Sequence, residues 1–198
     1  MKIYFYDMSK LSDSKIKLGY EMLDSNKKFK VDNCNNDERR RTIIASDLLT
    51  RTMLSQHLSI SPYDITFAHS SHGKPILPNS VVQFNVSHSG NYWVGCVDSK
   101  ACGIDIEVIR EVDLNAAKRF ATANEMEYIN SHNDTNLALL EIWTRKEAYF
   151  KSIGCGIATV LSAVDVLREE NLTTKINDDY IISVYSDHKD FEIINLEL

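Results

Sequence analysis

Apolar and polar residues alternate between positions 81 and 108, and this period of two predicts β-strands. The stretch divides into strands at 81–87, 92–97 and 102–108, with turns at Gly90-Asn91 and at 98–100 between them. Because these connections are short, we expect the three strands to form an antiparallel meander. Further strands are predicted at 2–6, 162–167, 172–176, 180–186 and 190–196.

Two longer segments, 38–58 and 134–153, have apolar residues at the spacing of α-helices. We expect Gly154 and Gly156 to end the second of them. Three further segments are predicted to be helical: 12–30, 113–120 and 124–132. The order of strand, long helix and strand meander occurs twice without a repeat of individual residues, and the predicted fold class is α+β.

The composition is that of an ordinary globular protein, since 43% of the 198 residues are hydrophobic and 25% are charged. A net charge of −6 argues against nucleic acid as a partner. No apolar run approaches the ~18–20 residues of a membrane span, so we expect no membrane partner either. The four cysteines contain no C-x-x-C pair, which favours reduced thiols and a cytoplasmic location.

Charged residues gather in one of the predicted strands and in the second long helix. Asp105 and Glu107 alternate with isoleucines, so both carboxylates should leave one face of the strand, roughly 6–7 Å apart. In the helix, Glu147 and Lys151 are one turn apart, and Trp143 lies one turn before them. Mg²⁺ binds oxygen ligands and is commonly held by carboxylates together with substrate phosphates. The pattern therefore predicts a magnesium–phosphate site, although each half alone also fits solvent-exposed carboxylates or a surface ion pair.

Four short motifs occur in a fixed order along the chain. They are G-K-P at 73–75, F-N-V-S-H-S at 84–89, G-I-D-I-E at 103–107 and W-T-R-K-E-A-Y-F-K at 143–151. In sequence and order they resemble the signature of the 4′-phosphopantetheinyl transferases. The length resembles the monomeric, Sfp-type branch of that superfamily. The resemblance implies a pseudo-dimer of two similar α/β halves, 1–100 and 101–198, each a long helix packed on an antiparallel strand meander, with the site between them.

The resemblance also implies a metal and a set of catalytic residues. Asp105, Glu107 and Glu147 would hold Mg²⁺, or Mn²⁺ in its place. Glu147 would act as the base toward the attacking serine, directly or through a metal-bound water. Lys151 would contact the coenzyme A phosphates and stabilise the charge on the departing one.

Coenzyme A would be bound mainly by residues of the first half. By resemblance, His88 contacts the pyrophosphate, Ser87 lies at the adenine end, Lys74 contacts a phosphate and Pro75 shapes the adenine pocket. The 3′-phosphate is assigned to basic residues before and at the start of the first long helix, namely Lys27, Lys30 and Arg40, with Arg41 as a further candidate.

The implied reaction transfers 4′-phosphopantetheine from coenzyme A to a serine of an apo peptidyl or acyl carrier protein and releases 3′,5′-ADP. The resemblance further implies a monomer that serves secondary metabolism. Two alternatives remain at this point. One is a metal-dependent phosphodiesterase or nuclease, because strand carboxylates near a lysine also suit phosphodiester hydrolysis. The other is a non-catalytic module that binds a carrier protein.

Overall fold

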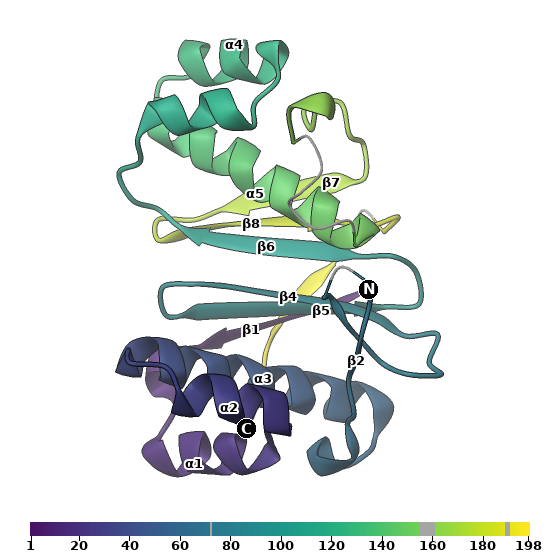
Figure 1. Cartoon of the computed structure of the whole chain (residues 1–198). Helices are drawn as coiled ribbons and strands as arrows, with labels where there is room; N and C mark the ends of the chain where they lie inside the picture. The colour runs from purple at the N-terminus through teal and green to yellow at the C-terminus, as the bar shows by residue number, and fades with distance from the viewer. Residues whose placement is uncertain (72, 155–160, 189–190) are drawn as a thin grey trace.

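Two β-sheets lie face to face between two groups of helices, so that the molecule has four layers (Figure 1). The computed structural model describes residues 1–71, 73–154, 161–188 and 191–198. No helix within these ranges is long and apolar enough to cross a bilayer. Cys34, Cys96 and Cys102 are free thiols. The mixture of packed sheets and helices confirms the predicted α+β class.

The strands are β1 (Lys2–Asp7), β2 (Ala68–His69), β3 (Pro75–Ile76), β4 (Gln83–Ser89), β5 (Tyr92–Asp98), β6 (Gly103–Val108), β7 (Leu172–Ile176), β8 (Tyr180–Tyr185) and β9 (Glu192–Asn195). The α-helices are α1 (Asp13–Met22), α2 (Ser25–Asp32), α3 (Asp37–Leu58), α4 (Ala123–Ser131) and α5 (Thr135–Ile153). Short 3-10 turns are η1 (Met8–Lys10), η2 (Pro62–Asp64), η3 (Leu114–Arg119) and η4 (Leu161–Ala163).

The strand order corrects the predicted meander. The first sheet has the order β4-β5-β1-β9 and the second has the order β6-β8-β7, while β2 and β3 form a separate hairpin. The hairpin of β4 and β5 is confirmed, but β6 leaves their sheet and pairs with β8 instead. The last strand, β9, returns to the first sheet and runs parallel to β1. Both long sheets therefore contain strands that are far apart in the sequence.

A core between the two sheets explains why β6 changes sheet. Ile104 and Ile106 of β6 are completely or almost completely buried, in one cluster with Ile3 and Val94 of the first sheet. A strand in this middle layer buries one face against the other sheet and turns its other face toward the covering helix. With both isoleucines in the core between the sheets, the alternation leaves Asp105 and its neighbour Glu107 on the face toward α5.

The helices of the first half cover the outer face of the first sheet. Leu48, Leu49 and Met53 of α3 are buried in one cluster with strand residues that include Phe84 and Trp93. The single helix predicted at 12–30 is wrong, because the chain forms α1 and α2 there. The break has a local cause, since the side chain of Asp24 caps the second helix by accepting a hydrogen bond from the Lys27 amide.

Helix α5 covers the second sheet. It begins after Asp134, whose side chain caps the first turn, and ends at Gly154 in the left-handed conformation with φ of 70°. Gly156, the other predicted terminator, lies outside the described residues. The strand predicted at 162–167 is wrong, because a 3-10 turn and a loop stand there.

Side chains of α5 hold this loop by its backbone. Lys146 donates to the carbonyls of Leu161 and Val164 at 2.9 and 2.6 Å. The same ammonium lies 2.8 Å from Glu125 Oε2, and both of these side chains are fully buried. Glu125 also accepts hydrogen bonds from the backbone amides of Thr122 and Val166. Such a network is satisfied only while both charges are present.

Gly103 allows α5 to approach β6 directly. A Cβ atom at this position would lie 1.9 Å from the carbonyl oxygen of Ala148 and 2.7 Å from the amide nitrogen of Ser152. Real Cβ atoms are not found at such distances, so any side chain here forces the helix backbone away from the strand. The first glycine of the G-I-D-I-E motif therefore brings the two chemically important segments together.

We expect Gly103→Ala to lower the free energy of unfolding by about 1–3 kcal/mol or more, because the overpacked contact is with helix backbone that cannot rotate away. Urea denaturation followed by circular dichroism measures the change. An unchanged unfolding midpoint would contradict the close approach of helix and strand.

Lys146→Met should lower the free energy of unfolding by about 3–5 kcal/mol, because it leaves the buried Glu125 carboxylate without its counter-ion. Lys17→Met on α1, where the lysine is exposed, is the matched control and should have an effect within about 0.5 kcal/mol. Denaturation midpoints of the two variants make the comparison. Equal midpoints would show that the buried pair contributes nothing.

Candidate functional site

Three adjoining pockets lie along β4, two of them against α5 and the third against α3. The carboxylate pocket has a volume of about 400 Å³ and is lined by Ser46, Val86, Ser87, His88, Asp105, Glu107, Trp143, Glu147 and Lys151. The α3 pocket, of about 250 Å³, shares Ser46, Val86 and His88 with it. The Gly-Lys-Pro pocket, of about 270 Å³, shares Val86, Glu147 and Lys151 with it. The structure thus brings the predicted carboxylates, lysine and histidine to one place.

Asp105 is held by residues from both layers around it. Ser87 on β4 donates to Asp105 Oδ1 at 2.6 Å, and Lys151 on α5 donates to the same oxygen at 2.6 Å. The Lys151 ammonium also donates to Ser87 Oγ at 2.9 Å, which closes a triangle. Lys151 therefore pairs with the strand carboxylate of Asp105.

Glu107 is oriented by three donors. Ser89 donates to Oε2 at 2.7 Å, Trp143 donates its indole N–H to Oε1 at 3.3 Å, and Arg110 donates to Oε2 at 2.8 Å. Ser89 Oγ also accepts a hydrogen bond from the amide of Val108 at 3.2 Å. Serines two residues apart on β4 thus match carboxylates two residues apart on β6. Trp143 thus both packs against the Phe120 ring and fixes the carboxylate.

Burial dominates the electrostatics of the carboxylates. Burial raises the pKa of Asp105 above its usual value, while the Lys151 ammonium and the Ser87 hydroxyl oppose the shift. Burial also raises the pKa of Glu147, and the charges of Asp105 and Glu107 add to the shift. Glu147 Oε1 and Asp105 Oδ2 are both buried with no hydrogen-bond partner in the described part of the chain. These two acceptors are left without compensation for the loss of water.

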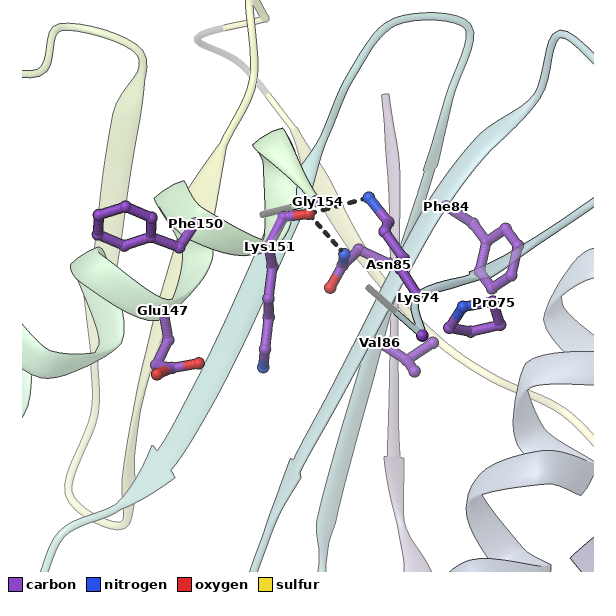
Figure 2. Close-up of a pocket in the computed structure, with 10 residues that line it drawn as sticks. Lys74, Pro75, Phe84, Asn85, Val86, Glu147, Phe150, Lys151 and Gly154 are labelled. Atoms are coloured by element: carbon purple, nitrogen blue, oxygen red, sulfur yellow. Dashed lines mark hydrogen bonds between the residues drawn. The ribbon is translucent and has the colours of Figure 1, made fainter. Parts of the chain in front are cut away.

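The cations that pair with these carboxylates are the Lys151 ammonium, at Asp105, and the Arg110 guanidinium, at Glu107. Within the described ranges, no three or more His, Cys, Asp or Glu side chains form a group that could hold a metal ion as they stand. Figure 2 shows Glu147 and Lys151 extending in the same direction from neighbouring turns of α5. The assignment of Asp105, Glu107 and Glu147 as metal ligands stays a prediction.

His88 lies where the carboxylate pocket and the α3 pocket meet, because it lines both. The residue is exposed at the mouth of these pockets, and desolvation by the surrounding protein lowers the pKa of its imidazole, with the nearby charge of Lys151 lowering it further. A neutral imidazole at neutral pH still has one N–H group to donate to an anion.

Lys27 faces the α3 pocket from α2. Its ammonium pairs with the buried carboxylate of Asp47 and lies 5.0 Å from the centre of the Phe67 ring. Asp47 also accepts from Arg51 Nε at 2.6 Å, so one carboxylate serves two cations. The carboxylate pocket and the α3 pocket together form one groove, with Glu107 in the carboxylate pocket. The cluster around Lys27 offers positive charge at the other end of this groove, in the α3 pocket.

Two of the predicted 3′-phosphate residues lie apart from this cluster. Lys30 is exposed on α2, and Arg40 pairs with the exposed Asp37 one turn earlier on α3. Neither residue lines the three pockets. Arg41 pairs with Asp13 at 2.8 Å and also donates to the carbonyl of Leu11, so it holds α1 against α3.

The G-K-P turn contributes Lys74 and Pro75 to the Gly-Lys-Pro pocket (Figure 2). The Lys74 ammonium donates to the backbone carbonyl of Lys151 at 2.9 Å, and Asn85 donates to the same oxygen at 3.3 Å. Pro75 lines both this pocket and the α3 pocket. The assigned contacts of Lys74 and Pro75 with coenzyme A stay predictions.

Sequence reasoning missed several residues of the groove. Ser46 lines two of the pockets, yet a serine inside a helix carries no sequence signal. Asp47 did carry a signal, because Arg51 lies four residues later in the same helix, a spacing that suits an ion pair. Phe67 gave no sign of its contact with Lys27, because that contact joins distant segments.

Comparison with known protein families supports the resemblance over nearly the whole chain. A model described as "4'-phosphopantetheinyl transferase, N-terminal" matches residues 10–100, and one described as "4'-phosphopantetheinyl transferase superfamily" matches residues 101–194. Together the two models leave only the two ends of the chain unmatched.

Individual relatives carry the same description. The 4'-phosphopantetheinyl transferase ffp of Bacillus subtilis is 32% identical over 138 residues, which cover 68% of this chain and 61% of ffp. HetI of Nostoc sp. is 37% identical over 130 residues, 61% of this chain and 55% of HetI. Sfp of Bacillus subtilis is 26% identical over 174 residues, 78% of this chain and 77% of Sfp. The match thus spans less than two thirds of the length of ffp and HetI. The chain belongs to the 4′-phosphopantetheinyl transferase superfamily.

Proposed function

We propose that this protein transfers 4′-phosphopantetheine from coenzyme A to a serine of an apo peptidyl or acyl carrier protein and releases 3′,5′-ADP. The observation that carries the proposal is the convergence of Asp105, Glu107, Glu147, Lys151 and His88 on one pocket of about 400 Å³. Phosphoryl transfer depends mainly on positioning and on neutralising charge, and this pocket offers groups for both. The family match and the names of the relatives support the same reaction.

The oxygen atoms of the pocket fit a divalent cation. Asp105 Oδ2 and Glu147 Oε1 are buried acceptors without a partner among the described residues, and Glu107 lies beside them. An all-carboxylate set suits Mg²⁺, with Mn²⁺ as an alternative. When bound, the metal would neutralise charge on the two phosphates of coenzyme A. Asp105, Glu107 and Glu147 are therefore proposed as its ligands.

Glu147 and Lys151 are proposed as the catalytic residues. The raised pKa of Glu147 makes its carboxylate a better proton acceptor, as the base toward a serine hydroxyl requires. The Lys151 ammonium is held in place by its hydrogen bonds to Asp105 Oδ1 at 2.6 Å and Ser87 Oγ at 2.9 Å. That charge would stabilise the phosphate of departing 3′,5′-ADP, because it is already oriented before the substrate arrives.

Coenzyme A would lie along the groove from the carboxylate pocket to the α3 pocket. His88, at the junction, would donate to the pyrophosphate, and Lys27 at the far end would attract the 3′-phosphate. Pro75, which lines the α3 pocket, is proposed at the adenine end. The assignment of Ser87 to the adenine end stays a prediction, since Ser87 lines the carboxylate pocket and donates to Asp105 there. Lys30 and Arg40 are proposed as flanking cations that act at longer range.

We further propose a monomer of two similar halves, 1–100 and 101–198, with the site between them. The two family models meet at residues 100 and 101, which supports this division. Each half has one long helix, α3 or α5, packed on its own sheet (Figure 1). Strand β9 belongs by sequence to the second half but is the edge strand of the first sheet. The two halves are therefore connected by this strand as well as by the chain at residues 100 and 101.

The proposal is tested by intact-protein mass spectrometry of an apo carrier domain incubated with this protein, coenzyme A and Mg²⁺. We expect the carrier to gain the mass of one phosphopantetheine group, and EDTA to prevent the gain. If no carrier among several peptidyl and acyl types is modified, the transferase proposal fails. Salt-sensitive cleavage of DNA would then favour the phosphodiesterase alternative.

Asp105→Asn should reduce turnover by on the order of 100-fold or more, because the pocket loses a charge aimed at the cation and at Lys151. The control is Glu21→Gln on the exposed side of α1, which should keep full activity. Circular dichroism shows whether both variants are folded. Full Mg²⁺-dependent activity in folded Asp105→Asn would contradict the assignment of this carboxylate.

Ser89→Ala should weaken metal binding about 10- to 100-fold, because Glu107 loses the hydroxyl that orients it. The free-ion electron paramagnetic resonance signal of Mn²⁺ measures the affinity without any turnover. The exposed Ser25→Ala on α2 is the matched control. An affinity equal to that of the wild type would show that the hydroxyl does not orient the carboxylate.

A further inference from the structure

We propose that Lys74 and Asn85 form a clamp on the backbone of Lys151 and act as positioning residues for its side chain. In this proposal Lys74 works through the helix and not as a ligand of a coenzyme A phosphate. The inference rests on the proposed function only for the catalytic role of Lys151. The clamp itself follows from contacts within the chain.

Both side chains donate to one oxygen atom. Lys74 Nζ lies 2.9 Å and Asn85 Nδ2 lies 3.3 Å from the carbonyl oxygen of Lys151, as the dashed lines in Figure 2 show. Lys74 comes from the G-K-P turn and Asn85 from β4, so both belong to the first half of the chain. Their common acceptor belongs to α5, in the second half. The contact therefore fixes one half against the other at the catalytic helix.

The end of a helix has a physical need for such donors. The last four carbonyls of an α-helix lack partners within the helix, and Lys151 lies in the last turn of α5. The amide of Gly154 satisfies the carbonyl of Phe150. The next carbonyl, that of Lys151, is satisfied from outside by Lys74 and Asn85. A cation at this position is also favoured by the helix dipole.

The environment of Lys74 differs from that of an ordinary turn lysine. Lys74 is half-buried, and this partial loss of water lowers the pKa of its ammonium. A charge that loses water is costly unless polar groups receive it. Its aliphatic stem passes the end of α5, with Cδ 3.8 Å from where a Cβ on Gly154 would lie. Asn85, the second donor, is buried. These features are those of a specific, partly buried contact of the G-K-P turn and β4 with the end of α5.

Lys151 is thereby held at both ends. Its carbonyl is held by Lys74 and Asn85, and its ammonium by Ser87 and Asp105. Asn85 and Ser87 are two residues apart and face the same side of β4, so one strand face controls both ends. A shift of the last turn of α5 would move the ammonium relative to the phosphates it is proposed to stabilise. A misplacement of about 1 Å is enough to slow a reaction markedly.

The test is Lys74→Met, which keeps most of the unbranched side chain and removes its ammonium group. Calorimetric titration gives the dissociation constant of coenzyme A, and the mass-spectrometric carrier assay gives kcat. We expect kcat to fall about 10- to 100-fold, while the dissociation constant stays within about twofold of the wild type. Hydrogen exchange should also be faster at the amides of residues 151–154. Lys17→Met on α1 is the matched control for loss of a lysine charge.

Asn85→Leu provides an independent check from the other donor. It should lower kcat in the same way, and the double variant should be little worse than the poorer single one, because both donors act on one oxygen. A coenzyme A dissociation constant raised tenfold or more in Lys74→Met, with kcat unchanged, would assign Lys74 to a phosphate and overturn the proposal. Unchanged kcat and unchanged exchange would overturn it as well. If the wild type modifies no carrier, the proposed function fails, and the exchange measurement still decides whether the clamp holds the helix.

Discussion

The placement of β6 between the first sheet and α5 is the constraint on which the rest of the site depends. Ile104 and Ile106 take the face toward the first sheet, so Asp105 and Glu107 must take the face toward the helix. The absence of a side chain on Gly103 lets the α5 backbone touch the strand. Hydrophobic burial and one close backbone contact thus hold together carboxylates that repel one another.

The burial of these carboxylates is only partly compensated by the groups around them. Buried carboxylates with partnerless oxygens are unfavourable in the absence of a further cation, and the Lys151 ammonium compensates only one of them directly. The Ser89 hydroxyl, the Trp143 indole N–H and the Arg110 guanidinium all orient the Glu107 carboxylate. A divalent cation would compensate the buried carboxylates, and so would stabilise the folded protein on binding. In the reaction proposed above, this compensation would favour binding of the metal together with the phosphates of coenzyme A.

The faces on which the charged residues lie could be predicted from local sequence patterns, whereas the order of the strands could not. The alternation around Asp105 and the helical spacing of Glu147 and Lys151 predict which faces carry the charges. The sheet order could not be predicted in the same way, because the departure of β6 and the return of β9 depend on burial between sheets far apart in sequence. The contact of Lys74 with α5 has the same origin, since it joins residues 77 positions apart. Local patterns specify faces, whereas tertiary packing specifies partners.

The most direct measurement is a crystal structure of the protein with coenzyme A and Mg²⁺. We predict that the pyrophosphate lies between His88 and Lys151, with the metal in contact with Asp105 and with the Lys74 ammonium still on the carbonyl of Lys151. Coenzyme A bound elsewhere, or a metal that avoids Asp105, would contradict the proposed transferase site.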